Sequence, residues 1–302
     1  MTLPALFLVS LSAFTHALWN FLSKRRNPPA AFFLMATAAS AVILSPLLFV
    51  FRAGLLVIPP VVWALLAATG AVQAAYYISL AAAYRTGELS LAYPLARSLP
   101  VVLVALLSAV LGRGEQITAL AYLGFSLVTI GCLLLPHPDF SHLHPRYYRH
   151  RWVLFALLAA VGVTAYTLLD DQALRILRSL PDTPLSPFGW ALLFAELESL
   201  SITGFMTVFL LGCERERQAL FRAQKTDWGE AAVMGVVILL TYGLVLTAMA
   251  YVRDVSYVSA FRQLSIPIGA ALGILLRKES AAWPKLVGIG LVMIGLTLTA
   301  LG

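Results

Sequence analysis

Ten apolar runs separated by short polar segments constrain this chain more than any other feature of its sequence. Each run holds about 18 to 25 residues, which is long enough for an α-helix to cross a hydrocarbon layer roughly 30 Å thick. Inside such a layer every backbone polar group needs an internal partner, so we expect the runs to be helices. The runs lie near residues 3–22, 30–51, 60–83, 89–111, 117–135, 152–169, 188–212, 229–251, 255–276 and 283–301.

The composition excludes an ordinary soluble domain. Charged residues make up 12% of the 302 residues, against about 25% in soluble proteins. A soluble protein that is 60% hydrophobic would lack the polar surface needed to cover its core. The formal charge of +7 does not form a basic stripe interleaved with aromatic residues, so we expect the chain to lie in a lipid bilayer and to bind no nucleic acid. These observations predict an all-α integral membrane protein.

The two halves of the chain resemble each other. Each ends in the pattern E-x8-G-x6-G, formed by Glu115, Gly124 and Gly131 and by Glu279, Gly288 and Gly295. We therefore expect a five-helix repeat at 1–138, a loop at 139–151 and a second five-helix repeat at 152–302. Because five is odd, the second copy enters the membrane from the opposite side. This predicts two inverted repeats around a central cavity, with a site between them.

The basic residues are unevenly distributed between the two sides of the expected bundle. Fourteen of the 21 lysines and arginines fall in or beside the loops that follow the first, third, fifth, seventh and ninth runs. Five fall on the other side, and two lie within runs. Cytoplasmic loops retain positive charge, so the charge count predicts that both termini lie outside a cell (inner) membrane.

Two arginines lie deep within apolar runs. Arg97 and Arg262 occupy the fourth and ninth runs, where a charged side chain is costly and usually faces a polar interior. A guanidinium binds carboxylate or phosphate through two parallel hydrogen bonds, so one interpretation is a clamp for an anionic substrate. The other interpretation is an ion pair with Glu196 or Glu198 of the seventh run. These glutamates are two residues apart and point to nearly opposite sides of a helix, and either is a candidate for proton coupling.

Other polar side chains are candidates for a substrate site. His16, Trp19 and Asn20 are spaced three and four residues apart, so they share one face of the first helix. That face either lines a cavity, with His16 able to carry a proton, or bonds neighbouring helices. The remaining candidates for substrate contact are Gln73, Tyr76, Tyr77, Tyr93, Tyr166 and Tyr242.

We expect no cofactor, no metal and no catalytic residue. The sequence has no Walker motif for ATP, and the histidines of "HPDFSHLH" lack the spacing of a catalytic metal site. A solvated loop is the simpler interpretation of that segment.

Three segments resemble a known superfamily. They are "AYPLARSLPVVLVALLSAVLGRGEQITALAYLGFSLVTIG" (92–131), "SAFRQLSIPIGAALGILLRKESAAWPKLVGIGLVMIG" (259–295) and "HALWN" (16–20). They are similar to the drug/metabolite transporter superfamily, and within it to the EamA-type transporters. The resemblance implies ten transmembrane helices around a central cavity and alternating access without ATP. It also implies cytoplasmic termini, which conflicts with the charge count.

These observations predict a secondary active or facilitative transporter. We expect an exporter of a small polar metabolite, an amino acid or an organic anion, rather than an enzyme. Two alternatives stay open. One is an exporter of many cationic compounds, with an acidic residue in a mostly apolar cavity. The other is an integral membrane enzyme that uses His16 or the histidine-rich loop. The sequence does not set the oligomeric state, and a monomer is compatible with it.

Overall fold

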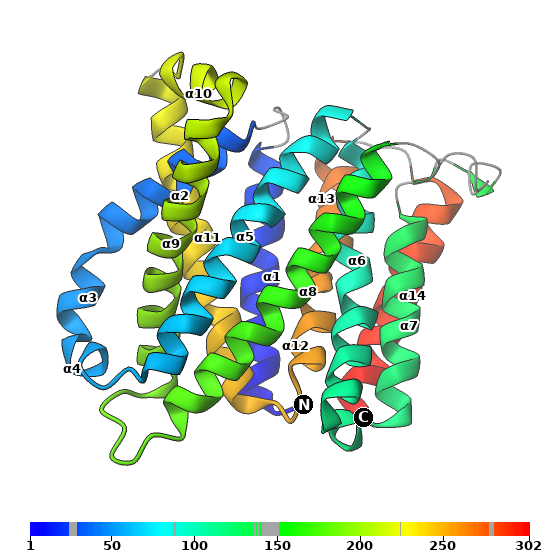
Figure 1. Cartoon of the computed structure of the whole chain (residues 1–302). Helices are drawn as coiled ribbons and strands as arrows, with labels where there is room; N and C mark the ends of the chain where they lie inside the picture. The colour runs from blue at the N-terminus through cyan, green and yellow to red at the C-terminus, as the bar shows by residue number, and fades with distance from the viewer. Residues whose placement is uncertain are drawn as a thin grey trace.

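The computed structural model of the chain is all-α (Figure 1). It describes residues 1–23, 29–86, 89–135, 137, 139–140, 151–223, 225–277 and 281–302. The helices of the first half are α1 (Leu3–Ser23), α2 (Ala30–Leu44), α3 (Pro46–Val50), α4 (Arg52–Leu55), α5 (Pro60–Thr86), α6 (Leu89–Ser108), the π-helix η1 (Ala109–Arg113), the 3₁₀ turn η2 (Gly114–Gln116) and α7 (Ala119–Leu134). The second half holds α8 (Arg151–Arg178), α9 (Pro187–Gly212), α10 (Glu214–Phe221), α11 (Lys225–Ala248), η5 (Met249–Tyr251), α12 (Val255–Phe261), η6 (Arg262–Leu264), α13 (Ser265–Arg277) and α14 (Trp283–Leu301).

The helices have the length and composition of membrane spans. Within the described residues, seven segments are long and apolar enough to cross a membrane. Three shorter apolar helices, at Leu3–Ala17, Ala30–Leu44 and Ala119–Leu134, accompany them. The fold class is therefore an all-α membrane protein, consistent with a bundle of about ten helices. Most of the long helices run along one common direction, and both termini lie at the end opposite α10 (Figure 1).

Local sequence signals set several helix starts. Thr118 accepts a hydrogen bond from the backbone N–H of Ala121 at the start of α7, and Ser186 accepts one from Gly189 at the start of α9. Asp254 caps α12 in the same way by accepting from the N–H of Ser256. Such caps satisfy N–H groups that have no partner within the helix.

The structure departs from the expected runs at three places. The expected run 30–51 is broken after Leu44, because Pro46 begins a new helix and cannot donate to the preceding turn. The expected run 255–276 is divided by the 3₁₀ turn η6. The run that was expected to end at 169 continues as α8 to Arg178. This third difference matters most, because it adds charged residues to the interior of the bundle.

A glycine seam joins α7 of the first half to α14 of the second, and the two helices lie side by side in Figure 1. A Cβ atom on Gly295 would lie 2.6 Å from the carbonyl oxygen of Gly124. A Cβ atom on Gly131 would lie 2.7 Å from the carbonyl oxygen of Gly288. The backbones therefore meet at a distance that no side chain permits. Lipid gives no hydrophobic drive for helix association, so such close packing is an important source of attraction.

Gly295→Ala tests this seam. We expect a loss of about 1–3 kcal/mol in unfolding free energy, because the added methyl group overpacks the contact with Gly124. Gly290→Ala is the matched control on the same helix, since no atom lies within 4 Å of the Cβ position at Gly290. Thermal unfolding in detergent measures both variants. Equal melting temperatures for the two variants would contradict the seam.

Candidate functional site

A buried polar network joins four helices in the interior of the bundle. Asp170 of α8 accepts hydrogen bonds from the Thr69 hydroxyl at 2.6 Å and from the Tyr242 hydroxyl at 2.5 Å. Glu198 of α9 accepts from the same Thr69 hydroxyl at 3.1 Å and from the Gln73 amide. Both carboxyl side chains are almost fully buried, with exposed fractions of 0% and 2%. Thr69 and Gln73 come from α5 and Tyr242 from α11, so the network links α5, α8, α9 and α11.

Thr69 is the central member of this network. Its hydroxyl has one hydrogen to donate but lies within hydrogen-bond distance of two carboxyl groups. Burial strengthens these hydrogen bonds, and it also raises the free-energy cost of an acceptor that has no donor. Removing Thr69 would therefore affect Asp170 and Glu198 together.

A layer of tyrosines and one arginine adjoins the carboxyl pair. The ring centroids of Tyr76 and Tyr166 lie 5.8 Å apart, and those of Tyr166 and Tyr242 lie 5.9 Å apart. Arg262 places its guanidinium 5.3 Å from the centroid of the Tyr242 ring and donates a hydrogen bond of 3.4 Å to the Tyr166 hydroxyl. Tyr76, Tyr242 and Arg262 are partly exposed rather than fully buried.

Arg97 connects the first helix to the break in the ninth run. Its guanidinium lies 3.4 Å from Nε2 of His16, and it donates at 3.5 Å to the carbonyl oxygen of Arg262 and to the Ser265 hydroxyl. Pro267 has no N–H to donate to the carbonyl of Gln263, which interrupts the helix near this point. The break thus provides one backbone acceptor and the Ser265 hydroxyl for Arg97, and Arg262 lies beside the tyrosines.

We call the carboxyl network, the adjoining tyrosines with Arg262, and Arg97 with its neighbours the polar centre. The structure brings most of the predicted site residues into it. His16 lies beside Arg97, and Tyr166 and Tyr242 lie beside Arg262. Gln73 and Glu198 belong to the carboxyl network. Tyr77 is stacked on Phe33 of α2, with ring centroids 4.8 Å apart. The side chains of Trp19, Asn20 and Tyr93 lie outside the described part of the structure, as does most of the expected loop 139–151.

The ion pair considered as an alternative for the two arginines does not occur in the described part of the chain. Arg97 contacts His16, Arg262 and Ser265, and Arg262 also contacts Tyr166 and Tyr242. Among the described residues, neither arginine forms a salt bridge with Glu196 or Glu198. Tyr242 lies between Arg262 and Asp170, because its ring contacts the guanidinium and its hydroxyl donates to the carboxyl group.

Sequence reasoning missed Asp170, Thr69 and Asp171. The two aspartates directly follow the expected run 152–169. A signal for a longer helix was present, because Asp171 and Arg175 are four residues apart and no proline or glycine intervenes before Pro181.

Ionic contacts also close the two ends of the bundle. At the end that carries the termini, Asp171 accepts from Arg113 and from Arg175, each at 2.7 Å. At the opposite end, Glu216 of α10 accepts from Arg85 at 2.9 Å and from the backbone N–H of Ala31 at 3.1 Å. The contacts with Arg113, Arg85 and Ala31 each join the first half to the second, whereas the bond between Arg175 and Asp171 lies within α8.

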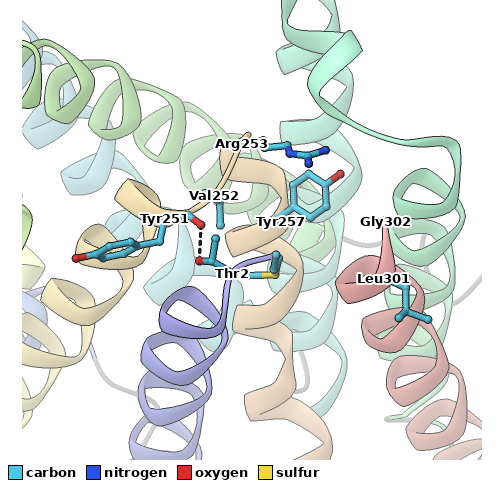
Figure 2. A pocket seen from close by; sticks show the side chains of 8 residues that line it. Thr2, Tyr251, Val252, Arg253, Tyr257, Leu301 and Gly302 are labelled. Atoms are coloured by element: carbon cyan, nitrogen blue, oxygen red, sulfur yellow. Dashed lines mark hydrogen bonds between the residues drawn. The ribbon is translucent and has the colours of Figure 1, made fainter.

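A separate cavity of about 260 Å³ lies at the end that carries the termini (Figure 2). Its lining residues are Met1, Thr2, Tyr251, Val252, Arg253, Tyr257, Leu301 and Gly302. The Thr2 hydroxyl donates to the carbonyl oxygen of Tyr251 at 2.7 Å. None of the residues of the polar centre lines this cavity. In the described residues no group of three or more His, Cys, Asp or Glu side chains has a metal-binding arrangement. Two histidines of the loop, His142 and His144, fall outside that part.

A bundle of membrane-length helices that encloses buried charges and tyrosines has the architecture of a multi-pass membrane transporter. Residues 3–135 match the EamA-like transporter family, the family that the sequence resembles. A protein of known crystal structure shares the fold over 97% of this chain and 98% of its own, with a TM-score of 0.65 and 16% sequence identity. No curated protein matches the sequence. The matched family is a family of transporters, which favours a transporter over the membrane-enzyme alternative.

Thr69→Val tests the carboxyl network. The variant keeps the side-chain shape but removes the donor that Asp170 and Glu198 share, so we expect a loss of about 1–3 kcal/mol in unfolding free energy. Thr297→Val is the control, because the Thr297 hydroxyl is exposed and bonds only its own helix, at the carbonyl of Met293. Chemical or thermal unfolding in detergent measures both variants. A similar small effect for the two variants would show that the network does not stabilise the fold.

Proposed function

We propose that this EamA-like transporter moves a small polar metabolite, an amino acid or an organic anion, by alternating access. The observation that carries the proposal is the polar centre, where Arg262 and Arg97 lie at the junction of the two halves. A guanidinium is a preferred partner for a carboxylate. The tyrosines beside it offer hydroxyl groups and aromatic faces for the remainder of the substrate. Both secondary active and facilitative transport fit this site.

The packing between the halves supports an inverted repeat. α5 of the first half packs on α8, and α11 of the second half packs in the equivalent way on α1. The pairs α6 with α8 and α13 with α1 are related in the same manner, as are α2 with α11 and α9 with α5. Reciprocal pairing of this kind is the signature of a two-fold axis between two copies.

The glycine seam has the same reciprocity. The repeated pattern aligns Gly124 with Gly288 and Gly131 with Gly295. Gly124 contacts Gly295, and Gly131 contacts Gly288. Each glycine therefore meets the counterpart of its helix neighbour, which is the relation expected for antiparallel helices across a pseudo-two-fold axis.

The ionic contacts at the two ends are suitable gates. Opening one end requires that Asp171 separate from Arg113, and opening the other requires that Glu216 separate from Arg85. In alternating access the two gates open in turn, while the centre stays in place. A multidrug exporter of cations is the second candidate, and the observation that favours it is the Asp170–Glu198 pair beside aromatic rings.

Arg97→Gln and Arg262→Gln test the substrate class in a thermal-shift screen of amino acids, organic anions and cationic drugs. We expect anionic or zwitterionic ligands to stabilise the wild type and to bind each variant about 10- to 150-fold more weakly, because a charged hydrogen bond contributes roughly 1.5–3 kcal/mol. Arg222→Gln, at the exposed end of α10, is the control. Full stabilisation of both variants by anions would contradict the clamp. Stabilisation of the wild type by cationic drugs alone would favour the second candidate.

We also propose a cell-membrane location with both termini outside, on the basis of the charge count. An alkaline phosphatase fused after Gly302 should then be active, because this enzyme folds only outside the cytoplasm. A green fluorescent protein fused at the same position should be dark if exported unfolded. Fluorescence together with an inactive phosphatase would show that the C-terminus lies in the cytoplasm, which contradicts the proposed orientation.

A further inference from the structure

Glu196 differs from every other described carboxyl group near the centre of the bundle. Its side chain is 0% exposed, and neither of its carboxyl oxygens has a hydrogen-bond partner among the described residues. Glu198, two residues later on α9, accepts bonds from Thr69 and Gln73. The two glutamates thus have similar burial but opposite hydrogen-bonding states.

The neighbours of Glu196 on α9 locate it at the junction with α2 and α11. Leu192, one turn earlier, faces α11, because a Cβ atom on Gly243 would lie 3.0 Å from its Cδ2 atom. Ser199, one turn later, donates to the carbonyl oxygen of Thr37 at 3.1 Å and bonds the Ser40 hydroxyl at 3.0 Å on α2. Residues three and four apart share a helix face, so Glu196 points between these two contacts. Since α2 belongs to the first half and α9 to the second, Glu196 lies where the halves meet.

No charged group of the described residues compensates Glu196. α2 carries no ionisable side chain. On α11, Asp227 and Glu230 lie in the first two turns, about 14 Å or more along the helix from the level of Glu196. The hydroxyl of Tyr242, also on α11, donates to Asp170 and not to Glu196. Arg52 of α4 is exposed and lies over the Phe49 ring. Within α9, Glu198 lies on the opposite face.

This environment determines the charge state. An ionised carboxylate without a partner in an apolar interior is so costly that the group binds a proton instead. We therefore expect Glu196 to be neutral in this conformation. A conformation in which α2 moves relative to α9 and admits water or a donor would favour its ionisation.

We propose that Glu196 is the group that binds and releases the coupling proton during transport, which rests on the transporter function proposed above. The carboxylate takes up a proton from water in the conformation open to one side. The neutral acid passes through the closed conformation, and the same proton leaves to water when the bundle opens to the other side. Of the other proton-coupling candidates, His16 lies 3.4 Å from the Arg97 guanidinium, where a second positive charge is unfavourable. Glu198 is held by its hydrogen bonds.

Infrared spectroscopy of the purified protein in lipid tests the protonation directly. The carbonyl stretch of a neutral carboxyl group is separate from that of a carboxylate. At neutral pH we expect Glu196→Gln to lack one neutral-carboxyl band of the wild type. Glu115→Gln, an exposed glutamate in η2, should keep it. Identical spectra for the wild type and Glu196→Gln would overturn the proposal.

Transport in proteoliposomes then separates the proton site from the proposed function. The probes are a panel of L-amino acids and dicarboxylates, with and without an imposed proton gradient. We expect Glu196→Gln to reduce gradient-driven accumulation at least tenfold and to retain substrate exchange at equal pH. Full gradient dependence in Glu196→Gln would overturn the proton role and leave the transporter function intact. If the wild type transports no member of the panel, the proposed substrate class fails, and the infrared result alone decides whether Glu196 holds a proton.

Discussion

The hydrocarbon interior of a membrane supplies no hydrogen-bond partner, so each polar group buried in the bundle must find one within the protein. This constraint organises the polar centre. Asp170 and Glu198 are satisfied by Thr69, Gln73 and Tyr242 from neighbouring helices, and these bonds specify how α5, α8, α9 and α11 fit together. Among the described residues, Arg262 meets the same requirement through tyrosines rather than through a carboxylate. A guanidinium that is not committed to a protein anion remains suited to an anionic ligand.

The elements of the fold were largely predictable, because hydropathy alone identifies apolar helices. α14 (Trp283–Leu301) and α9 (Pro187–Gly212) begin and end close to the expected residues. The breaks were harder to predict. Pro46 divides an expected run, whereas Pro100 lies within the continuous helix α6. That difference depends on packing, which a single sequence does not contain.

Membership of the polar centre was predictable where the signal was a charge inside an apolar run. Arg97, Arg262 and Glu198 were found in this way and lie in the polar centre. Asp170 was missed because it lies at the end of its apolar run. Hydropathy assigns a carboxylate at that position to the loop, whereas α8 continues for eight residues beyond it. Glu196 could be named from the sequence but not distinguished from Glu198. The hydrogen bonds of each carboxyl group distinguish Glu198, which is held by Thr69 and Gln73, from Glu196, for which we propose a proton-carrying role.

We propose that substrate binds between the halves, at Arg262 and the tyrosines. The most direct test is an experimental structure with the ligand that stabilises the protein most strongly. The account predicts that an acidic group of this ligand contacts the Arg262 guanidinium, with Tyr166 or Tyr242 against the rest of the molecule. A ligand found instead in the cavity lined by Thr2, Tyr251 and Tyr257, with the polar centre unchanged, would contradict the account.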